Sequence, residues 1–255
     1  MRGPQSNLPQ STAEILARVR ERSPRVHCIT NAVAQAFTAN VLLAFGATPS
    51  MTIAPEEVGA FVAGADALLV NLGTFDAERR SAIGVAVDAA SRTVPWVLDP
   101  VFIDRSPARA EYARSLVVRS PAAVRLNATE FAALAGAPAA AETLASYARD
   151  RHTIVGLTGA TDVVTDGARR AQIGNGHVLM RRVTAMGCAG SALVAACIAV
   201  EPDHWLATAA GLLALGVAGE IAAERARGPG SLSIEIIDVL HALDREALLE
   251  RAEVT

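Results

Sequence analysis

The sequence predicts an α/β fold, a three-layer αβα sandwich built on a mainly parallel central sheet with an antiparallel edge. Short apolar segments alternate with helix-length segments along most of the chain, which implies parallel strands joined by right-handed crossovers and covered by helices on both faces. The alternation breaks once, where two tight-turn sequences follow each other closely, so one edge is expected to be antiparallel. With 51% apolar residues among 255, the chain can bury a large core.

The chain is expected to form a single domain over residues 1–255. No stretch rich in proline, glycine or serine is long enough to act as a flexible linker. Residues 1–10 are polar and contain prolines, so we expect them to be disordered or loosely packed, and they lack the apolar core of a signal peptide. The apolar stretches at 192–200 and 205–219 are shorter than the roughly 18–20 residues that cross a bilayer, so no membrane association is expected.

Charge and cysteine content narrow the possible functions. A net charge of −3 and a pI of about 6.0 do not favour nucleic acid or an anionic membrane as a partner. All 23 basic residues are arginines, which excludes mechanisms that need a lysine amine, such as Schiff-base catalysis. An odd number of scattered cysteines (Cys28, Cys188 and Cys197) indicates free thiols in the cytoplasm. The five histidines show no metal-ligand spacing, and we interpret them as structural or exposed.

In the first third of the chain, predicted helices alternate with a predicted strand. Residues 11–14 (Ser-Thr-Ala-Glu) form a capping-box pattern, which predicts the start of a helix. A short apolar strand follows at 26–29. Residues 32–45 predict a helix that Gly46 ends, with 49–51 in the loop beyond it.

The same alternation of strands and helices continues toward the C-terminus. We expect strands at 67–71, 95–98, 123–126 and 153–157, and helices at 77–90, 109–118, 129–134 and 141–149. Between 163 and 183, strand-like segments are separated by Asp166-Gly167 and by Gly174-Asn175-Gly176, which predicts antiparallel hairpins. The remaining chain predicts helices at 187–200, 205–225 and 231–243.

Polar residues follow the predicted parallel strands at the points where they end. Ligands of open α/β sheets bind outside the carboxyl ends of the strands, so these side chains are expected to converge on one crevice. For any one of them alone, a role in a turn or helix cap explains the residue equally well. The residues are Asn31, Asn71, Thr74, Asp99, Asn127, Glu130 and Thr158.

The segment 183–192 carries the sharpest local motif, because Gly187, Cys188 and Gly190 open a helix of small residues. Small side chains let a ligand approach the backbone, and the amides of a helix N-terminus suit a phosphate. Cys188 would lie in the field of this helix end, which favours the thiolate. A buried cysteine that merely begins a packed helix is the alternative.

Nine short motifs, in order along residues 15 to 243, resemble those of the hydroxyethylthiazole kinase family within the ribokinase-like superfamily. They are Val-His-Cys-Ile-Thr-Asn at 26–31, the segment 39–51, Asn-Leu-Gly-Thr at 71–74, Val-Leu-Asp-Pro-Val at 97–101, Asn-Ala-Thr-Glu at 127–130, Thr-Gly at 158–159, Thr-Asp-Gly at 165–167, Gly-Cys at 187–188 and Gly-Pro-Gly-Ser at 228–231. The resemblance implies a ribokinase-like kinase that uses ATP and Mg²⁺ to phosphorylate the primary alcohol of 4-methyl-5-(2-hydroxyethyl)thiazole, a salvage step of thiamine biosynthesis. It also implies a homotrimer.

The resemblance also implies roles for individual residues. It implies catalytic roles for Cys188, which takes the place where sugar kinases of the superfamily carry an aspartate base, and for Gly187 beside it. The other implied roles are substrate binding for Met51, Asn31 and Gly187, ATP binding for Arg125, Thr158 and Asn127, and magnesium binding for Asp99 and Glu130. Without its motif, Met51 would be interpreted as an ordinary core methionine.

The chain departs from the family pattern near the phosphate. Ala185, Met186 and Leu126 replace residues that are usually glycine, threonine and glycine, and glycine permits backbone conformations that other residues do not. Two alternatives therefore stay open. One is a ribokinase-like kinase for another small primary alcohol, such as a hydroxymethylpyrimidine, and the other is a catalytically impaired thiazole-binding protein.

Overall fold

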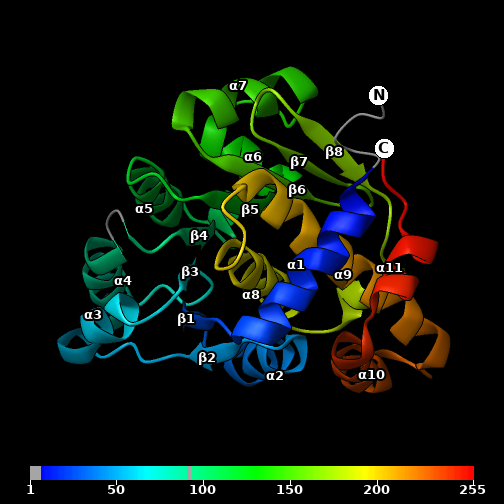
Figure 1. The fold of residues 1–255 in the computed structure, drawn as a ribbon. Helices are drawn as coiled ribbons and strands as arrows, with labels where there is room; N and C mark the ends of the chain where they lie inside the picture. Colours follow the sequence, from blue (N-terminus) through cyan, green and yellow to red (C-terminus); the bar gives the residue numbers. More distant parts are fainter. Residues whose placement is uncertain (1–6, 91–92) are drawn as a thin grey trace.

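The computed structural model describes residues 7–90 and 93–255, which fold around one eight-stranded sheet (Figure 1). The strand order is β2-β1-β3-β4-β5-β6-β7-β8. The strands are β1 (Arg25–Ile29), β2 (Thr48–Ser50), β3 (Ala67–Asn71), β4 (Trp96–Asp99), β5 (Ala123–Asn127), β6 (Ile154–Thr158), β7 (Asp162–Thr165) and β8 (Arg170–Ile173). Strands β1 to β6 pair in parallel, whereas β7 and β8 are antiparallel. The predicted parallel sheet with an antiparallel edge is confirmed.

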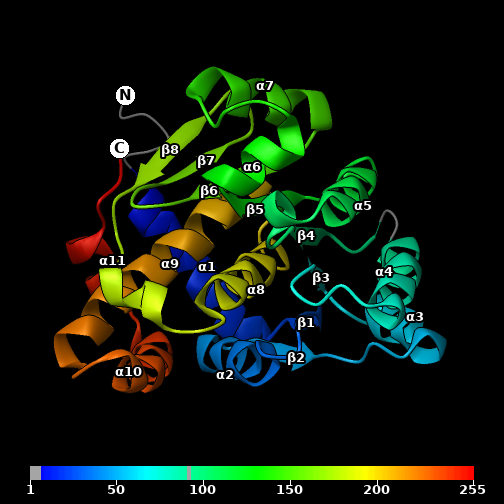
Figure 2. The ribbon, with the colours of Figure 1, turned by 180° about the vertical axis from the view of Figure 1, so that it is seen from behind.

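Helices cover both faces of this sheet, so the three-layer αβα arrangement is also confirmed (Figures 1 and 2). One face carries α1 (Leu8–Arg22), α2 (Gln35–Phe45), α8 (Met186–Ile198), α9 (His204–Arg225), α10 (Pro229–Ala242) and α11 (Arg245–Arg251). The other carries α3 (Pro55–Ala63), α4 (Ala77–Ala90), α5 (Pro107–Val117), α6 (Ala128–Ala135) and α7 (Ala141–Arg151). Each face has its own core of buried apolar side chains, as expected when a parallel sheet is covered on both sides.

Helix α9 is the one helix, within residues 7–90 and 93–255, that is long and apolar enough to span a bilayer by length and composition. It has 22 residues, so it is longer than the apolar stretch at 205–219. Of its most apolar window, 83% is buried inside the protein, where it packs against α8, α1 and α10. The apolar composition of α9 is therefore explained by its place in the core.

The predicted start of the first helix was wrong. Helix α1 begins at Leu8, and Ser11 lies inside it rather than at its cap. Proline in the first helical turn has no intrahelical hydrogen bond to lose, so Pro9 suits this earlier start. Leu8 is fully buried, so the segment expected to be loosely packed does not extend to it. Residues 8–10 of that segment belong to α1, and residues 1–6 lie outside the described residues.

Two further predictions are corrected by the edges of the sheet. Residues 49–51 were expected in a loop, but Thr48–Ser50 form the short edge strand β2, where Pro49 is tolerated because a strand at an edge pairs on one side only. After Gly174 the second hairpin is replaced by a 3₁₀ helix, η3 (Val178–Arg182). The free edge of β8 is instead covered by C-terminal residues, since Ile173 bridges to Val254.

Asn175 explains why the chain leaves the sheet at this point. Its side-chain amide donates to Glu220 Oε2 at 3.0 Å and to the carbonyl oxygen of Arg251 at 2.7 Å. The turn is therefore anchored to α9 and α11 rather than to β8. Helices α3 and α11 and the 3₁₀ turn η2 (Ile103–Arg105) were not predicted from the sequence.

Candidate active site

Three polar side chains at the ends of neighbouring strands form one buried hydrogen-bonded chain. Asn31 follows β1, while Asn71 and Asp99 are the last residues of β3 and β4. Asn31 Nδ2 donates to Asn71 Oδ1 at 3.1 Å, and Asn71 Nδ2 donates to Asp99 Oδ2 at 2.8 Å. All three side chains are buried. The predicted convergence of strand ends is therefore confirmed for these residues.

The first turns of α8 close over this chain at two points. Asn31 Nδ2 also donates to the sulfur of Cys188 at 3.1 Å, and Ser191 Oγ donates to Asp99 Oδ2 at 2.7 Å. Ser191 was not among the site residues predicted from the sequence. Its spacing of four residues from Gly187 was the available signal, because residues four apart lie on the same face of a helix.

Arg125 of β5 extends to the same helix turn. A Cβ atom added at Gly187 would lie 2.8 Å from Arg125 Nη1, so the guanidinium occupies the space that only a glycine leaves open. Arg125 also faces the carboxylate of Asp99, which it stabilises electrostatically. Its Nε atom is buried and has no hydrogen-bond partner. This nitrogen can therefore donate to a ligand.

Burial is the largest influence on the pKa values of Asp99 and Cys188. It raises the pKa of Asp99, although the charge of Arg125 and the hydrogen bonds from Ser191 and Asn71 act in the opposite direction. Burial and the nearby Asp99 also raise the pKa of Cys188 to about 11. This shift is opposite to the one expected for a Cys188 thiolate, because desolvation and the charge of Asp99 both disfavour the anion.

Glu130 and Asn127 fix the loops after β4 and β5. The two carboxylate oxygens of Glu130 accept hydrogen bonds from the backbone amides of Phe102 and Asn127, each at 2.9 Å. Asn127 Oδ1 accepts from the amides of Thr129 and Glu130, both at 3.0 Å, and so caps α6. The side-chain oxygen of Asn127 therefore caps α6, while Glu130 links the two loops.

Thr158 lies opposite Asn127 in the β5–β6 register, and its hydroxyl donates to the carbonyl oxygen of Leu126 at 3.4 Å. Asp162 follows four residues later and accepts a hydrogen bond from the amide of Gly159 at 2.9 Å. Burial raises the pKa of Asp162, and the charge of Arg125 opposes this shift. Sequence reasoning missed Asp162, which places a second acidic group near Arg125.

Met51 comes directly after the edge strand β2. It is half-buried and packs against the core on the face that α2 and α8 cover. The structure therefore places it at the carboxyl end of the sheet, next to β1, where the strand-end residues also gather.

Several groups of this site are left without protein partners. Asn31 Oδ1 is buried and accepts no hydrogen bond, and no side chain caps the N-terminus of α8. The described residues contain no cluster of three or more His, Cys, Asp and Glu side chains that could hold a metal. The site therefore offers a ligand one buried acceptor, one buried donor and the amides of a helix end.

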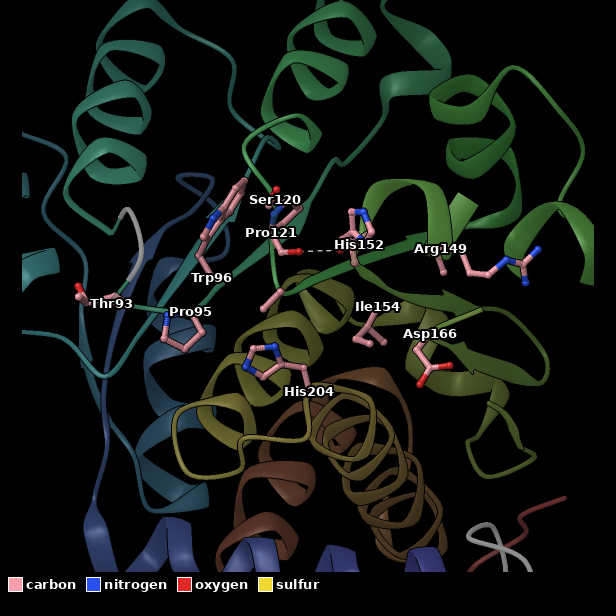
Figure 3. A pocket seen from close by; sticks show the side chains of 14 residues that line it. Thr93, Pro95, Trp96, Ser120, Pro121, Arg149, His152, Ile154, Asp166 and His204 are labelled. Atoms are coloured by element: carbon pink, nitrogen blue, oxygen red, sulfur yellow. Dashed lines mark hydrogen bonds between the residues drawn. The ribbon is translucent and has the colours of Figure 1, made fainter. Parts of the chain in front are cut away.

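A separate cavity of about 790 Å³ lies at the amino ends of the strands, opposite the carboxyl ends that form the candidate site (Figure 3). Trp96 and Ile154, the first residues of β4 and β6, line it together with His152 and His204. The predicted site residues are absent from its lining. This cavity is thus distinct from the site at the strand ends.

The fold defines a class of proteins, those with the ribokinase-like fold. The structure is similar to that of a ribokinase-like superfamily protein from Enterococcus faecalis V583, with a TM-score of 0.65, and the match covers 96% of this chain and 92% of that one. At 12% sequence identity this likeness shows the fold alone.

Closer relatives give the family. The sequence profile of the hydroxyethylthiazole kinase family matches residues 16–246. A hydroxyethylthiazole kinase from Granulibacter bethesdensis is 46% identical over 96% of this chain and 94% of its own length. The structure of a hydroxyethylthiazole kinase protein from Pyrococcus horikoshii OT3 matches with a TM-score of 0.92 at 36% identity, over 96% of this chain and 98% of that one. The chain belongs to the hydroxyethylthiazole kinase family and is a kinase.

Proposed function

We propose that this enzyme transfers the terminal phosphoryl group of ATP to the primary alcohol of 4-methyl-5-(2-hydroxyethyl)thiazole. One observation carries the proposal most directly. The buried chain of Asn31, Asn71 and Asp99 meets the uncapped N-terminus of α8 at Cys188, and a hydrogen-bond acceptor is left unpaired there. The names of the relatives supply the identity of the alcohol.

The acceptor side of the site consists of Asn31, Cys188 and Met51. Because Asn31 donates both of its side-chain hydrogen bonds through Nδ2, its Oδ1 atom is left to accept a hydrogen bond from the substrate hydroxyl. With its pKa at about 11, Cys188 is a neutral thiol that orients the alcohol rather than a strong base. A weak base is sufficient, since phosphoryl transfer depends mainly on positioning and charge neutralisation. Met51 supplies an apolar, polarisable contact for the sulfur-containing ring.

The phosphate side consists of Gly187, Arg125 and the amides of the first turn of α8. Backbone amides at a helix N-terminus bind anions, and Arg125 adds the positive charge that a lysine supplies in other phosphotransferases. Gly187 lets the arginine lie against this turn. Thr158 and Asn127, at the adjacent ends of β6 and β5, are proposed to contact the nucleotide.

Asp99 and Glu130 fit a role on the magnesium side. Mg²⁺ typically keeps several waters and takes one or two carboxylates together with phosphate oxygens, so a protein cage of three or more ligands is not needed. When bound, the ion would neutralise the developing charge on the phosphates. Asp99 places a carboxyl oxygen where the charge of Arg125 acts on it, whereas Glu130, with both oxygens on backbone amides, would act through water.

We also propose that the enzyme is a cytoplasmic homotrimer with a role in thiamine salvage. Three large apolar side chains are exposed on elements that pack together: Leu43 on α2 at 58%, Ile234 on α10 at 63% and Val178 on η3 at 70%. Contact between subunits would bury them. Light scattering coupled to size-exclusion chromatography should give three times the 26.4 kDa mass of the chain.

An assay of the purified enzyme with ATP, Mg²⁺ and the thiazole alcohol tests the proposed function. We expect the phosphorylated thiazole by mass spectrometry, and its loss when Mg²⁺ is chelated. A hydroxymethylpyrimidine tested under the same conditions separates the proposed acceptor from a related alcohol. Thiazole binding by calorimetry without any turnover would contradict the proposed reaction and indicate an impaired kinase.

A further inference from the structure

A buried histidine lies beside the segment that carries Met51 and has no role in the proposed reaction. His27, in the middle of β1, is fully buried, and both of its ring nitrogens are engaged. Nδ1 lies 2.8 Å from Ser50 Oγ, and Nε2 lies 3.1 Å from the carbonyl oxygen of Thr52. These partners are the two residues on either side of Met51.

The hydrogen-bond partners fix the state of the ring. A carbonyl oxygen can only accept, so His27 Nε2 carries the hydrogen and donates to Thr52. Burial lowers the pKa of His27 and favours the neutral imidazole. Nδ1 therefore accepts from the hydroxyl of Ser50, which can donate.

The segment that His27 holds has little other support. Strand β2 has three residues and pairs only with β1, and residues 51–54 adopt no regular structure before α3 begins. In register, His27 lies beside Ser50, the last residue of β2. Beyond that point, the hydroxyl of Thr52 bonds to Glu57 of α3. An edge strand this short would fray at its end without a side-chain anchor.

His27 and Met51 lie on opposite sides of the sheet. His27 lies on the α3 side of the sheet, with its ring centroid 5.9 Å from that of Phe61. Met51 packs against the core on the other side, which α2 and α8 cover. His27 can thus hold the backbone on both sides of Met51 without occupying the space that Met51 faces.

We infer that His27 is a positioning residue, which fixes residues 50–52 so that Met51 is already in place when the thiazole ring binds. This inference rests on the proposed function, in which Met51 lines the thiazole pocket. A preformed segment lowers the cost of ordering on binding. Loss of the anchor should weaken binding of the alcohol and leave binding of ATP unchanged.

Steady-state kinetics of three variants tests the inference. His27→Phe removes both hydrogen bonds at similar volume, and Ser50→Ala removes one at the exposed edge without disturbing the core. Cys28→Ala is the matched control, because Cys28 is the next residue on β1, equally buried but on the opposite face. If residues 50–52 of a variant adopt the binding arrangement only about a tenth of the time, the apparent affinity for the thiazole alcohol falls about tenfold.

For His27→Phe we expect the KM for the thiazole alcohol to rise about tenfold, with kcat and the KM for ATP within about twofold. Ser50→Ala should show a smaller rise, and Cys28→Ala none. Hydrogen exchange of the amides at 51–54 should accelerate in the first two variants only. Unchanged thiazole KM in both, or equal losses for both substrates, would overturn the inference. If His27→Phe does not fold, Ser50→Ala decides alone. A wild-type enzyme that neither binds nor phosphorylates the thiazole would instead overturn the proposed function, and this inference with it.

Discussion

Asn71 and Asp99 end neighbouring parallel strands in register, and the amide of Asn71 donates to the carboxylate of Asp99 across a distance of 2.8 Å. Asn71 uses its oxygen as well, accepting from Asn31 Nδ2 at 3.1 Å and from the amide of Gly73 at 3.0 Å. Its side chain therefore links the proposed alcohol side of the site to the proposed magnesium side. The position of Asp99 relative to Cys188 depends on this amide.

Replacing Asp99 by Asn should stabilise the protein and strongly lower the rate of phosphoryl transfer. Asn is nearly isosteric and can still accept from Asn71 and Ser191. The pKa of Asp99 is raised on folding, so ionisation of this group lowers stability as the pH rises above the unfolded value of about 3.9. We expect Asp99→Asn to unfold with about 1 kcal/mol more free energy at pH 7, a common gain when a functional site is relaxed.

This gain in stability should disappear below about pH 3.9, where Asp99 is protonated in both states of the wild type. Phosphoryl transfer should fall by about a hundredfold or more. Chemical denaturation across pH and a coupled kinase assay measure the two effects. Asp88→Asn is the control, because Asp88 is an exposed carboxylate paired with Arg119, and its loss should change either quantity little.

Cys188 should react slowly with iodoacetamide at neutral pH. With a pKa of about 11, the thiolate fraction is small at pH 7 and grows about tenfold per pH unit. The alkylation rate, followed by peptide mass spectrometry, should therefore keep rising to pH 10. Cys28 and Cys197, fully or almost fully buried with pKa values of about 12, serve as internal references and should stay unmodified in the folded protein. A rate that levels off by pH 8 would show that Cys188 is a thiolate after all.

The Cys188→Ala variant should lower kcat far more than the affinity for ATP. The thiol accepts a hydrogen bond from Asn31 and so orients the proposed acceptor, whereas the proposed nucleotide contacts are made by other residues. Cys188→Ser, which keeps a polar atom at this point, should retain kcat within about tenfold. Initial rates with each substrate varied in turn measure the split. Equal losses of kcat and ATP affinity in Cys188→Ala would indicate a packing role.

Gly73→Ala should displace Asn31. A Cβ atom at residue 73 would lie 2.7 Å from Asn31 Nδ2 and 2.8 Å from Asn31 Cβ, closer than packing allows. We expect a loss of about 1–3 kcal/mol in stability, typical of overpacking, together with a fall in kcat/KM for the alcohol. Gly84→Ala is the control, since a Cβ atom there meets nothing within 4 Å, and removing a mid-helix glycine should stabilise α4. Unchanged kinetics in Gly73→Ala would separate Asn31 from the reaction.

Ala185→Gly should stabilise the protein. Ala185 caps α8 with φ 69°, in the left-handed region that costs a residue with a side chain roughly 1–2 kcal/mol. Because glycine also loses more entropy on folding, a net gain of about 0.5 to 1 kcal/mol is expected. Thermal unfolding measures it. Ala189→Gly, in the buried part of the same helix, should have the opposite sign, and a loss of stability in both variants would contradict this interpretation.

The sequence by itself determined the class of fold and most of the site. Apolar segments marked five of the eight strands to within about one residue of their ends, and polar residues at strand ends predicted that Asn31, Asn71 and Asp99 would meet. Both signals are local: a strand is encoded by its own residues, and parallel strands bring their carboxyl ends to one edge of the sheet.

Only the tertiary structure decided the properties that depend on distant neighbours. The neutral thiol of Cys188 results from its burial beside Asp99, and Ser191 gains its partner only when α8 packs on β4. His27 and the edge strand β2 likewise acquire their roles through each other. Desolvation and hydrogen bonding between residues far apart in the chain exist only once the chain has folded, so no local pattern records them.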